Sequence, residues 1–215
     1  AYGYENFKEE IPNVSTIAEE NPFEKFKSRI ANILVGLGLI ETYTYHLTNS
    51  IIENENMNTS LPLVELANAM SNEYNVLRTW MLPSVMNVLQ ENKHHEYPQN
   101  IFNIGTVFKK DSKQETGVLE QDRLAVVLCG QDVDYTKIKQ VLDALFDAIG
   151  MKYKANSTEH SSFINGRVAR AAVKGNKIAY IGEIHPQVLE NFELEMPVAG
   201  FELNLTELFK EFKKF

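Results

Sequence analysis

The stretch that decides the fold runs from Ile101 to Asp111 and reads "IFNIGTVFKKD". Its β-branched and aromatic side chains are typical of a strand, and Gly105 marks a possible bulge. A polar loop, "KDSKQETGVLEQD", leads on to a second apolar strand, "RLAVVLCG". The first strand ends in two lysines and an acid. This ending leaves two interpretations open, a phosphate-binding strand end or a solvated hairpin end.

Two amphipathic helices flank these strands in the sequence. The first has Asn21 as a cap and Pro22 at the first helical position. Its apolar side chains recur at helical spacing and form one stripe, Phe23, Phe26, Ile30, Ile33, Leu34 and Leu37. The second helix follows Asp134 and is expected to stop at Gly150.

The remaining segments alternate between short strands and helices. Strands are expected at "ETYTYHL", "LPLVEL" and "PVAGFELNL", and a polar loop at residues 53–60. A helix is expected near Pro83, a hairpin turning at Gly175–Asn176, a short helix opening at Pro186, and a closing helix at "TELFKEF". These patterns predict an α+β fold with a mainly antiparallel sheet flanked by helices. Residues 1–21 are expected to form a linker arm from a preceding domain, and residues 22–215 one core domain.

Composition narrows the class of protein. The formal charge of −8 argues against a surface that binds nucleic acid over its whole extent, although a local basic patch is compatible with it. Cys129, the one cysteine, is expected to be a small buried hydrophobe, which fits a reducing, cytoplasmic compartment. No apolar run approaches the length of a membrane span, and the N-terminus does not resemble a signal peptide.

Motifs of catalysis or metal binding are missing from the sequence. The five histidines do not have metal-ligand spacing, and neither a nucleophile elbow nor a P-loop is present. Arg167 and Arg170 are expected on opposite faces of a strand. Arg78 has apolar neighbours, so either a buried salt bridge or a contact to a substrate or partner carboxylate would explain it.

Six segments in order are similar to one known family. The most specific of them are "NEYNVLRTWMLP", "IGEIHPQVLENF" and "FELNL". Together they resemble the beta subunits of phenylalanyl-tRNA synthetases over nearly all 215 residues. Because the sequence ends with "FELNLTELFKEFKKF" and shows no further anticodon-binding domain, it resembles the archaeal and eukaryotic form, and the chain is expected to be its C-terminal core domain.

The resemblance implies a fold like that of class II synthetase catalytic domains, with degenerate signatures. The aromatic–Arg–x–acid motif of class II catalytic domains corresponds to Phe108, Lys109 and Asp111 here, with lysine where a catalytic domain has arginine. The planar fork of arginine makes bidentate bonds that an ammonium group cannot make.

A second class II signature, rich in glycine and ending in an arginine, is also degenerate. It matches the segment from Gly200 to Glu207, where one glycine remains, no arginine appears, and Phe201 and Leu203 are expected to obstruct a nucleotide. We therefore expect that this domain has no catalytic residues, and that the "FKKD" ending is a vestige on a solvated strand end.

The resemblance implies a role in assembly. The domain would pair with the catalytic alpha subunit in an (αβ)₂ heterotetramer and support ATP-dependent charging of tRNA-Phe with phenylalanine. We expect the first helix to contribute to pairing through Phe23, Phe26, Ile30, Leu34 and Leu37. No cofactor or metal is expected in this domain, although the whole enzyme would use ATP and Mg²⁺. An ATP-binding, adenylate-forming domain and a stand-alone RNA-binding domain are the alternatives.

Overall fold

The computed structural model describes residues 2–11, 18–69 and 71–212. Within the predicted linker arm, residues 1 and 12–17 lie outside the described residues, as do residues 70 and 213–215 of the predicted core domain. The described part of the arm contains one 3₁₀ turn, η1 (Tyr4–Asn6), and is almost entirely exposed.

Helices and short strands alternate along the first half of the chain. In order they are α1 (Pro22–Gly36), β1 (Ile40–Glu41), β2 (Leu47–Thr48), η2 (Ile51–Glu55), β3 (Val64–Glu65), β4 (Val76–Leu77) and α2 (Leu82–Glu91). The second half has longer strands: β5 (Gln99–Lys110), β6 (Val118–Cys129), α3 (Tyr135–Ile149), β7 (Lys154–Ser157), β8 (Phe163–Val173), β9 (Asn176–Ile184), α4 (Pro186–Asn191), β10 (Val198–Asn204) and α5 (Leu205–Phe212).

The described residues form a seven-stranded sheet in the order β1-β5-β6-β10-β9-β8-β7. Among the described strands of this sheet, β1 and β5 pair in parallel and the other pairs are antiparallel. A three-stranded antiparallel sheet, β2-β4-β3, lies beside it. Both the α+β class and the mainly antiparallel sheet are therefore confirmed.

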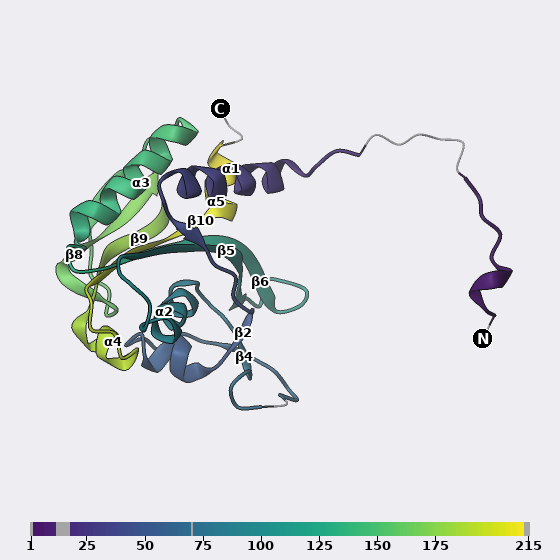
Figure 1. The fold of residues 1–215 in the computed structure, drawn as a ribbon, viewed down its shortest axis with the longest axis horizontal. Coiled ribbons are helices and arrows are strands. Elements are labelled where there is room, and N and C mark those ends of the chain that lie inside the picture. Colours follow the sequence, from purple (N-terminus) through teal and green to yellow (C-terminus); the bar gives the residue numbers. More distant parts are fainter. Residues whose placement is uncertain (1, 12–17, 70, 213–215) are drawn as a thin grey trace.

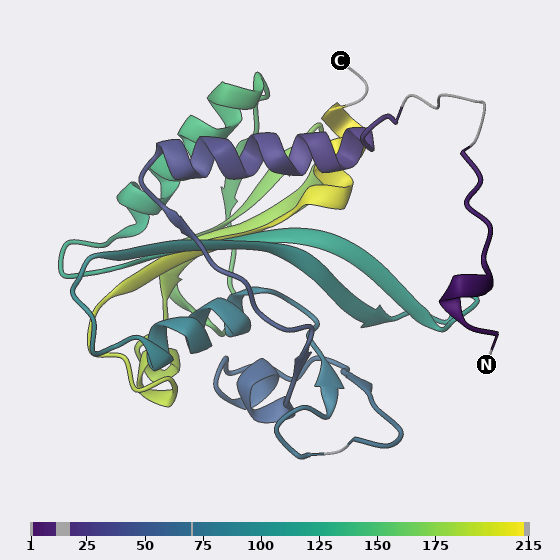
Figure 2. The ribbon, with the colours of Figure 1, turned by 45° about the vertical axis from the view of Figure 1, so that its right-hand side comes forward.

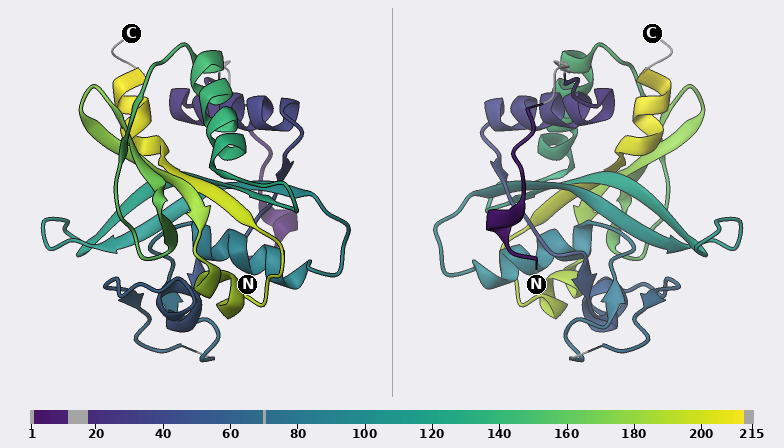
Figure 3. Two further views of the ribbon diagram at one scale, coloured as in Figure 1. Left: turned by 90° about the vertical axis from the view of Figure 1, so that its left-hand side faces the viewer. Right: turned by 90° about the vertical axis from the view of Figure 1, so that its right-hand side faces the viewer.

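Helices cover both faces of the large sheet (Figures 1 and 2). On one face α1, α3 and α5 pack over a core that includes Ile30, Phe146 and Phe201. On the other face α2 and α4 pack over a second core, which includes Met86 and Val127. Figure 3 shows the two layers from the sides, with the sheet between them. None of the described helices has the length and apolar character needed to cross a membrane.

Local signals at helix ends are confirmed. The side chain of Asn21 accepts a hydrogen bond from the backbone N–H of Phe23, and the side chain of Asp134 accepts one from Lys137. Gly150 ends α3 in the left-handed conformation that glycine adopts most easily. Cys129 is buried in the core under α2, as predicted.

Three local predictions are wrong. The β5–β6 register is continuous, so Gly105 is not a bulge. Residues 42–46 of "ETYTYHL" are not in a strand, and only the flanking residues pair. The polar segment after it begins with the helical turn η2, in which Glu53 is buried. In each case a tertiary contact, and not local propensity, decides the structure.

Candidate functional site

A cavity of about 480 Å³ lies on the sheet face that carries α2. The side chains of β6 show how it arises. Ala125, Val127 and Cys129 alternate onto this face and are buried in its core, whereas Arg123, two residues before Ala125, lines the cavity. Because alternate residues of a strand share one face, the side chains that β6 places on this face are charged at Arg123 and apolar from Ala125 onward.

The same change occurs on β10. Val198 is in the core under α2, and Glu202 and Asn204 line the cavity. β10 pairs with both β6 and β9, so the polar ends of these strands lie together. The cavity thus occupies the part of this face where the strands carry polar side chains.

Glu202 is the anionic centre of the cavity. Its carboxylate accepts hydrogen bonds from the backbone N–H groups of Met81 at 2.7 Å and Leu82 at 3.0 Å, where α2 begins. Its other oxygen accepts a bond from Nη1 of Arg123 at 2.7 Å, and the carboxylate side chain is only 4% exposed. These bonds hold the start of α2 against the sheet, so both carboxylate oxygens of Glu202 already accept structural hydrogen bonds.

Cationic side chains outnumber this acid. Lys109, Arg123 and Arg170 are half-buried in the cavity wall, and Lys110 and Lys177 line it from exposed positions. Burial lowers the pKa of Lys109, and the neighbouring Arg123 and Arg170 guanidinium groups lower it further. The three half-buried cations therefore lie close enough to repel one another.

Aromatic rings form part of the cavity wall. The guanidinium carbon of Arg170 lies 3.8 Å from the ring centroid of Tyr180, which is a cation–π contact. The ring of His160 lies 4.8 Å from that of Tyr180 and 5.7 Å from that of Trp80. Burial and the nearby Arg170 lower the pKa of His160, which favours its neutral form.

This arrangement suits anion binding better than bond-breaking chemistry. The wall contains several cations, and its one acid is already bonded. Within the described residues, no three His, Cys, Asp or Glu side chains lie together as they would to hold a metal ion. The expectation that the domain holds no metal stays a prediction.

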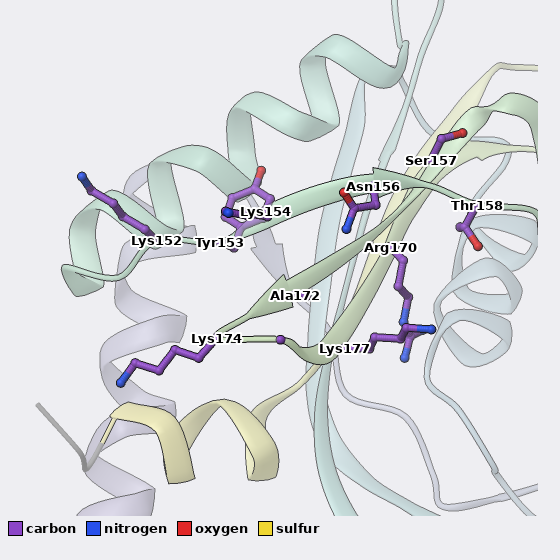
Figure 4. A pocket seen from close by; sticks show the side chains of 11 residues that line it. Lys152, Tyr153, Lys154, Asn156, Ser157, Thr158, Arg170, Ala172, Lys174 and Lys177 are labelled. Carbon is purple, nitrogen blue, oxygen red and sulfur yellow. The ribbon is translucent and has the colours of Figure 1, made fainter.

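A second, larger hollow adjoins the cavity at the edge of the sheet. It has a volume of about 800 Å³ and is lined by β7, β8 and the β8–β9 hairpin (Figure 4). Arg170 and Lys177 line both hollows. In Figure 4, Lys152 and Lys174 point away from the other side chains of this hollow.

The four residues of the degenerate motifs do not gather in one place. Lys109 lines the cavity, and Gly200 lies beneath Leu82, where an added Cβ would come within 3.3 Å of its side chain. The ring of Phe108 packs against His46, with centroids 5.6 Å apart. The carboxylate of Asp111 accepts a bond from the backbone N–H of Lys113 in the β5–β6 loop.

Two expectations about this region need correction. Phe201 and Leu203 are buried in the core on the opposite face of the sheet, because they alternate with Gly200 and Glu202, so they do not obstruct the cavity. The "FKKD" ending is not wholly solvated, since Lys109 is half-buried. Arg170, which is expected on the opposite strand face from Arg167, lines the cavity. The other polar residues of the cavity, Arg123 and Glu202, could be predicted from the period-2 alternation of their strands.

The helix residues expected at a subunit interface divide into two groups. Phe26, Ile30 and Leu34 are buried within this chain at 3%, 0% and 0% exposure, so they pack the fold and are not available to a partner. Phe23 is half-buried, with its ring 4.9 Å from that of Phe209 on α5. Leu37 is 44% exposed, and of the five it is the one that is free to contact another chain.

Large apolar side chains are exposed just after this helix. Val35 and Leu37 at its end, Ile40 in β1, and Tyr43 and Tyr45 beyond it are each at least 44% exposed. β1 is an edge strand, and Figure 2 shows it connecting α1 to the lower layer along the outside of the sheet. We call Val35, Leu37, Ile40, Tyr43 and Tyr45 the edge segment. Such exposure in consecutive elements is typical of a protein interface.

Arg78 is buried for a different reason from either interpretation of the sequence. Its Nε donates to the backbone carbonyl of Thr106 at 2.8 Å, and its Nη1 donates to the hydroxyl of Thr44 at 2.8 Å. In the described part of the chain it forms no salt bridge. Arg78 therefore connects β5 to the segment after β1.

Comparison with known proteins places these features in context. Residues 8–205 match the family model described as phenylalanyl tRNA synthetase beta chain CLM domain. The chain is 42% identical over 213 residues to the phenylalanine–tRNA ligase beta subunit of Pyrococcus abyssi, covering 98% of this chain and 38% of the relative. It is 39% identical over 221 residues to that of Thermococcus gammatolerans and 36% identical over 223 residues to that of Haloarcula marismortui. These alignments cover 98% and 97% of this chain, and 39% and 38% of the relatives. The chain thus spans less than half the length of the curated relatives it matches.

Proposed function

Because this chain belongs to the phenylalanyl-tRNA synthetase beta chain family, in its CLM domain, we propose that it is a non-catalytic assembly module of phenylalanine–tRNA ligase. The domain pairs with the alpha subunit, which carries the catalytic site, and so supports ATP-dependent charging of tRNA-Phe. The observation that carries this proposal is the exposed edge segment at the end of α1 and along β1.

The edge segment offers what a partner needs. Tyr43 is 83% exposed and Tyr45 75% exposed, and tyrosine is enriched among the residues that dominate binding at interfaces. β1 has only two residues, and as an edge strand it leaves backbone groups on one side available. The buried stripe of α1 holds this segment in place without contacting the partner.

A double variant and a control variant test this assignment. Leu37→Asp combined with Tyr43→Asp should weaken binding of the alpha subunit at least about tenfold, because both changes place charge where apolar surface is buried on binding. Leu66→Asp, at a half-exposed leucine next to β3, is the matched control. Equal affinity of the double variant and the unmodified chain, with both folded by circular dichroism, would contradict it.

The finer features of the proposal follow the family. We infer that the sheet has the class II synthetase arrangement, that the complex is an (αβ)₂ heterotetramer, and that it works in the cytoplasm. Adenylate formation by this domain is disfavoured, because Glu202 is bonded to Arg123 and α2 and is not free for catalysis. A stand-alone RNA-binding role is disfavoured by the formal charge of −8.

A further inference from the structure

The cavity on the α2 face contains cations that the chain does not neutralise. Arg123 is paired with Glu202, but among the described residues Lys109, Lys110, Arg170 and Lys177 have no carboxylate within salt-bridge distance. All four line the same 480 Å³ space. In a chain whose formal charge is −8, this local excess of positive charge is not a general property of the surface.

Half-burial makes this excess costly at Lys109 and Arg170, whereas Lys110 and Lys177 are exposed. An unpaired cation withdrawn from water loses solvation that only an opposite charge or hydrogen bonds restore. In addition, the Nε atoms of Arg123 and Arg170 are buried and have no hydrogen-bond partner in the part of the chain that the structure describes. A ligand with several anionic oxygens would compensate both deficits at once.

We propose that this cavity binds a compact polyphosphate anion, with Lys109 and Arg170 as its principal ligands and Lys177 at its rim. A singly charged carboxylate would neutralise only one of four unpaired cations, whereas a chain of phosphoryl groups carries several charges in a small volume. The cavity has the size of a typical small-molecule site. This inference is independent of the pairing role, since the edge segment and the cavity share no residue.

The aromatic wall allows two sources of the same anion. Inorganic tripolyphosphate would use the cations alone. A nucleoside triphosphate could also place its base against Trp80 or His160, whose rings border the cavity. The phosphoryl groups are the shared chemistry, and the experiment separates the two sources.

The test is calorimetric titration of the 215-residue chain with tripolyphosphate, ATP and AMP, without Mg²⁺ and at constant ionic strength. We expect saturable binding of tripolyphosphate that weakens at least tenfold in Lys109→Gln and in Arg170→Gln. Lys25→Gln, an exposed lysine on α1 across the sheet, should bind as the unmodified chain does. Tighter binding of ATP than of tripolyphosphate would identify the nucleotide as the source.

Several results would overturn the proposal. These are no binding of tripolyphosphate or ATP by the unmodified chain, equal loss of affinity in Lys25→Gln, or binding of an RNA oligonucleotide alone. Lys177→Gln is a second variant at an exposed position, so its folding is not in question, and it should weaken binding in the same direction. Normal pairing with the alpha subunit in all these variants would show that anion binding in the cavity and pairing through the edge segment are independent.

Discussion

At the scale of single residues, Glu53 shows how the fold changes the chemistry of a side chain. Its carboxyl group is fully buried in η2, where one oxygen accepts a bond from the backbone N–H of Thr79 at 3.0 Å. Burial raises its pKa to about 8, with a further contribution from the nearby Glu202, while Arg78 acts in the opposite direction. The group is therefore protonated in the folded chain at neutral pH.

This pKa predicts a pH dependence of stability. Between the ordinary carboxyl pKa of 4.5 and about 8, the folded state keeps a proton that the unfolded state has released. The free energy of unfolding therefore falls as pH rises through this window, and Glu53→Gln removes this contribution. In urea unfolding at pH 5, 6.5 and 8, the free energy of unfolding of Glu53→Gln should increase relative to that of the unmodified chain as the pH rises. A difference that stays constant with pH would contradict the assignment.

Position 105 requires a glycine because the side chain of Arg78 lies against it, and not because the strand has a bulge there. A Cβ added to Gly105 would lie 2.3 Å from Nη2 of Arg78, whose guanidinium is held by bonds to Thr44 and Thr106. Gly105→Ala should lower the free energy of unfolding by about 1–3 kcal/mol, because the buried guanidinium must move. Gly117→Ala is unsuitable as a control, since Gly117 has a positive φ, so Gly36→Ala in α1 is used. Denaturant unfolding measures both, and an unchanged midpoint for Gly105→Ala would contradict this explanation.

At the scale of elements, α1 separates the residues that fold the chain from those that can bind a partner. Ile30 is fully buried, and the rings of Phe26 and Phe212 pack with centroids 4.9 Å apart. Sequence periodicity predicted the whole apolar stripe, because it follows from helical geometry. Sequence periodicity could not show which end of the stripe is covered by α3 and α5.

Alanine substitutions should separate these two groups. Ile30→Ala should lower the free energy of unfolding by about 2–5 kcal/mol, through lost burial and the cavity left behind. Leu37→Ala should change it by less than about 1 kcal/mol, because Leu37 is 44% exposed. Urea denaturation measures both. Similar losses for the two variants would mean that the end of α1 is packed more tightly than its exposure indicates.

The strand predictions show a different limit. β5 and β6 were predictable because long runs of β-branched and aromatic residues, separated by a polar loop, leave few alternatives. β1 and β2 were not, because each has two residues and its pairing depends on partners distant in sequence, Ile101 and Phe102 for β1 and Val76 and Leu77 for β2. A pattern within "ETYTYHL" carries no information about those partners.

At the scale of the whole molecule, the family and its fold class were accessible from sequence, whereas the cavity was not. Its cationic residues come from β5, β6, β8 and β9, whose order in the sheet differs from their order in the chain. Lys109 was found because a motif contains it. Arg123 lies near Lys109 because β5 and β6 form one hairpin, whereas Arg170 on β8 reaches this face through β10 and β9, which join β6 to β8 in the sheet.

The two surfaces that remain open lie on different parts of the molecule. The edge segment runs along β1, and the cavity is lined by β5, β6, β10, β9 and β8, with no residue in common with the edge segment. This separation is why loss of pairing and loss of anion binding can be tested by different variants.

The most direct test of the central claim is the mass of the complex that this chain forms with the alpha subunit of phenylalanine–tRNA ligase from the same source. The two chains would be co-purified and analysed by light scattering. We predict a stable complex larger than either chain, dissociated by the Leu37→Asp, Tyr43→Asp double variant and not by Leu66→Asp. A folded chain that elutes apart from the alpha subunit would contradict the assembly role proposed for this domain.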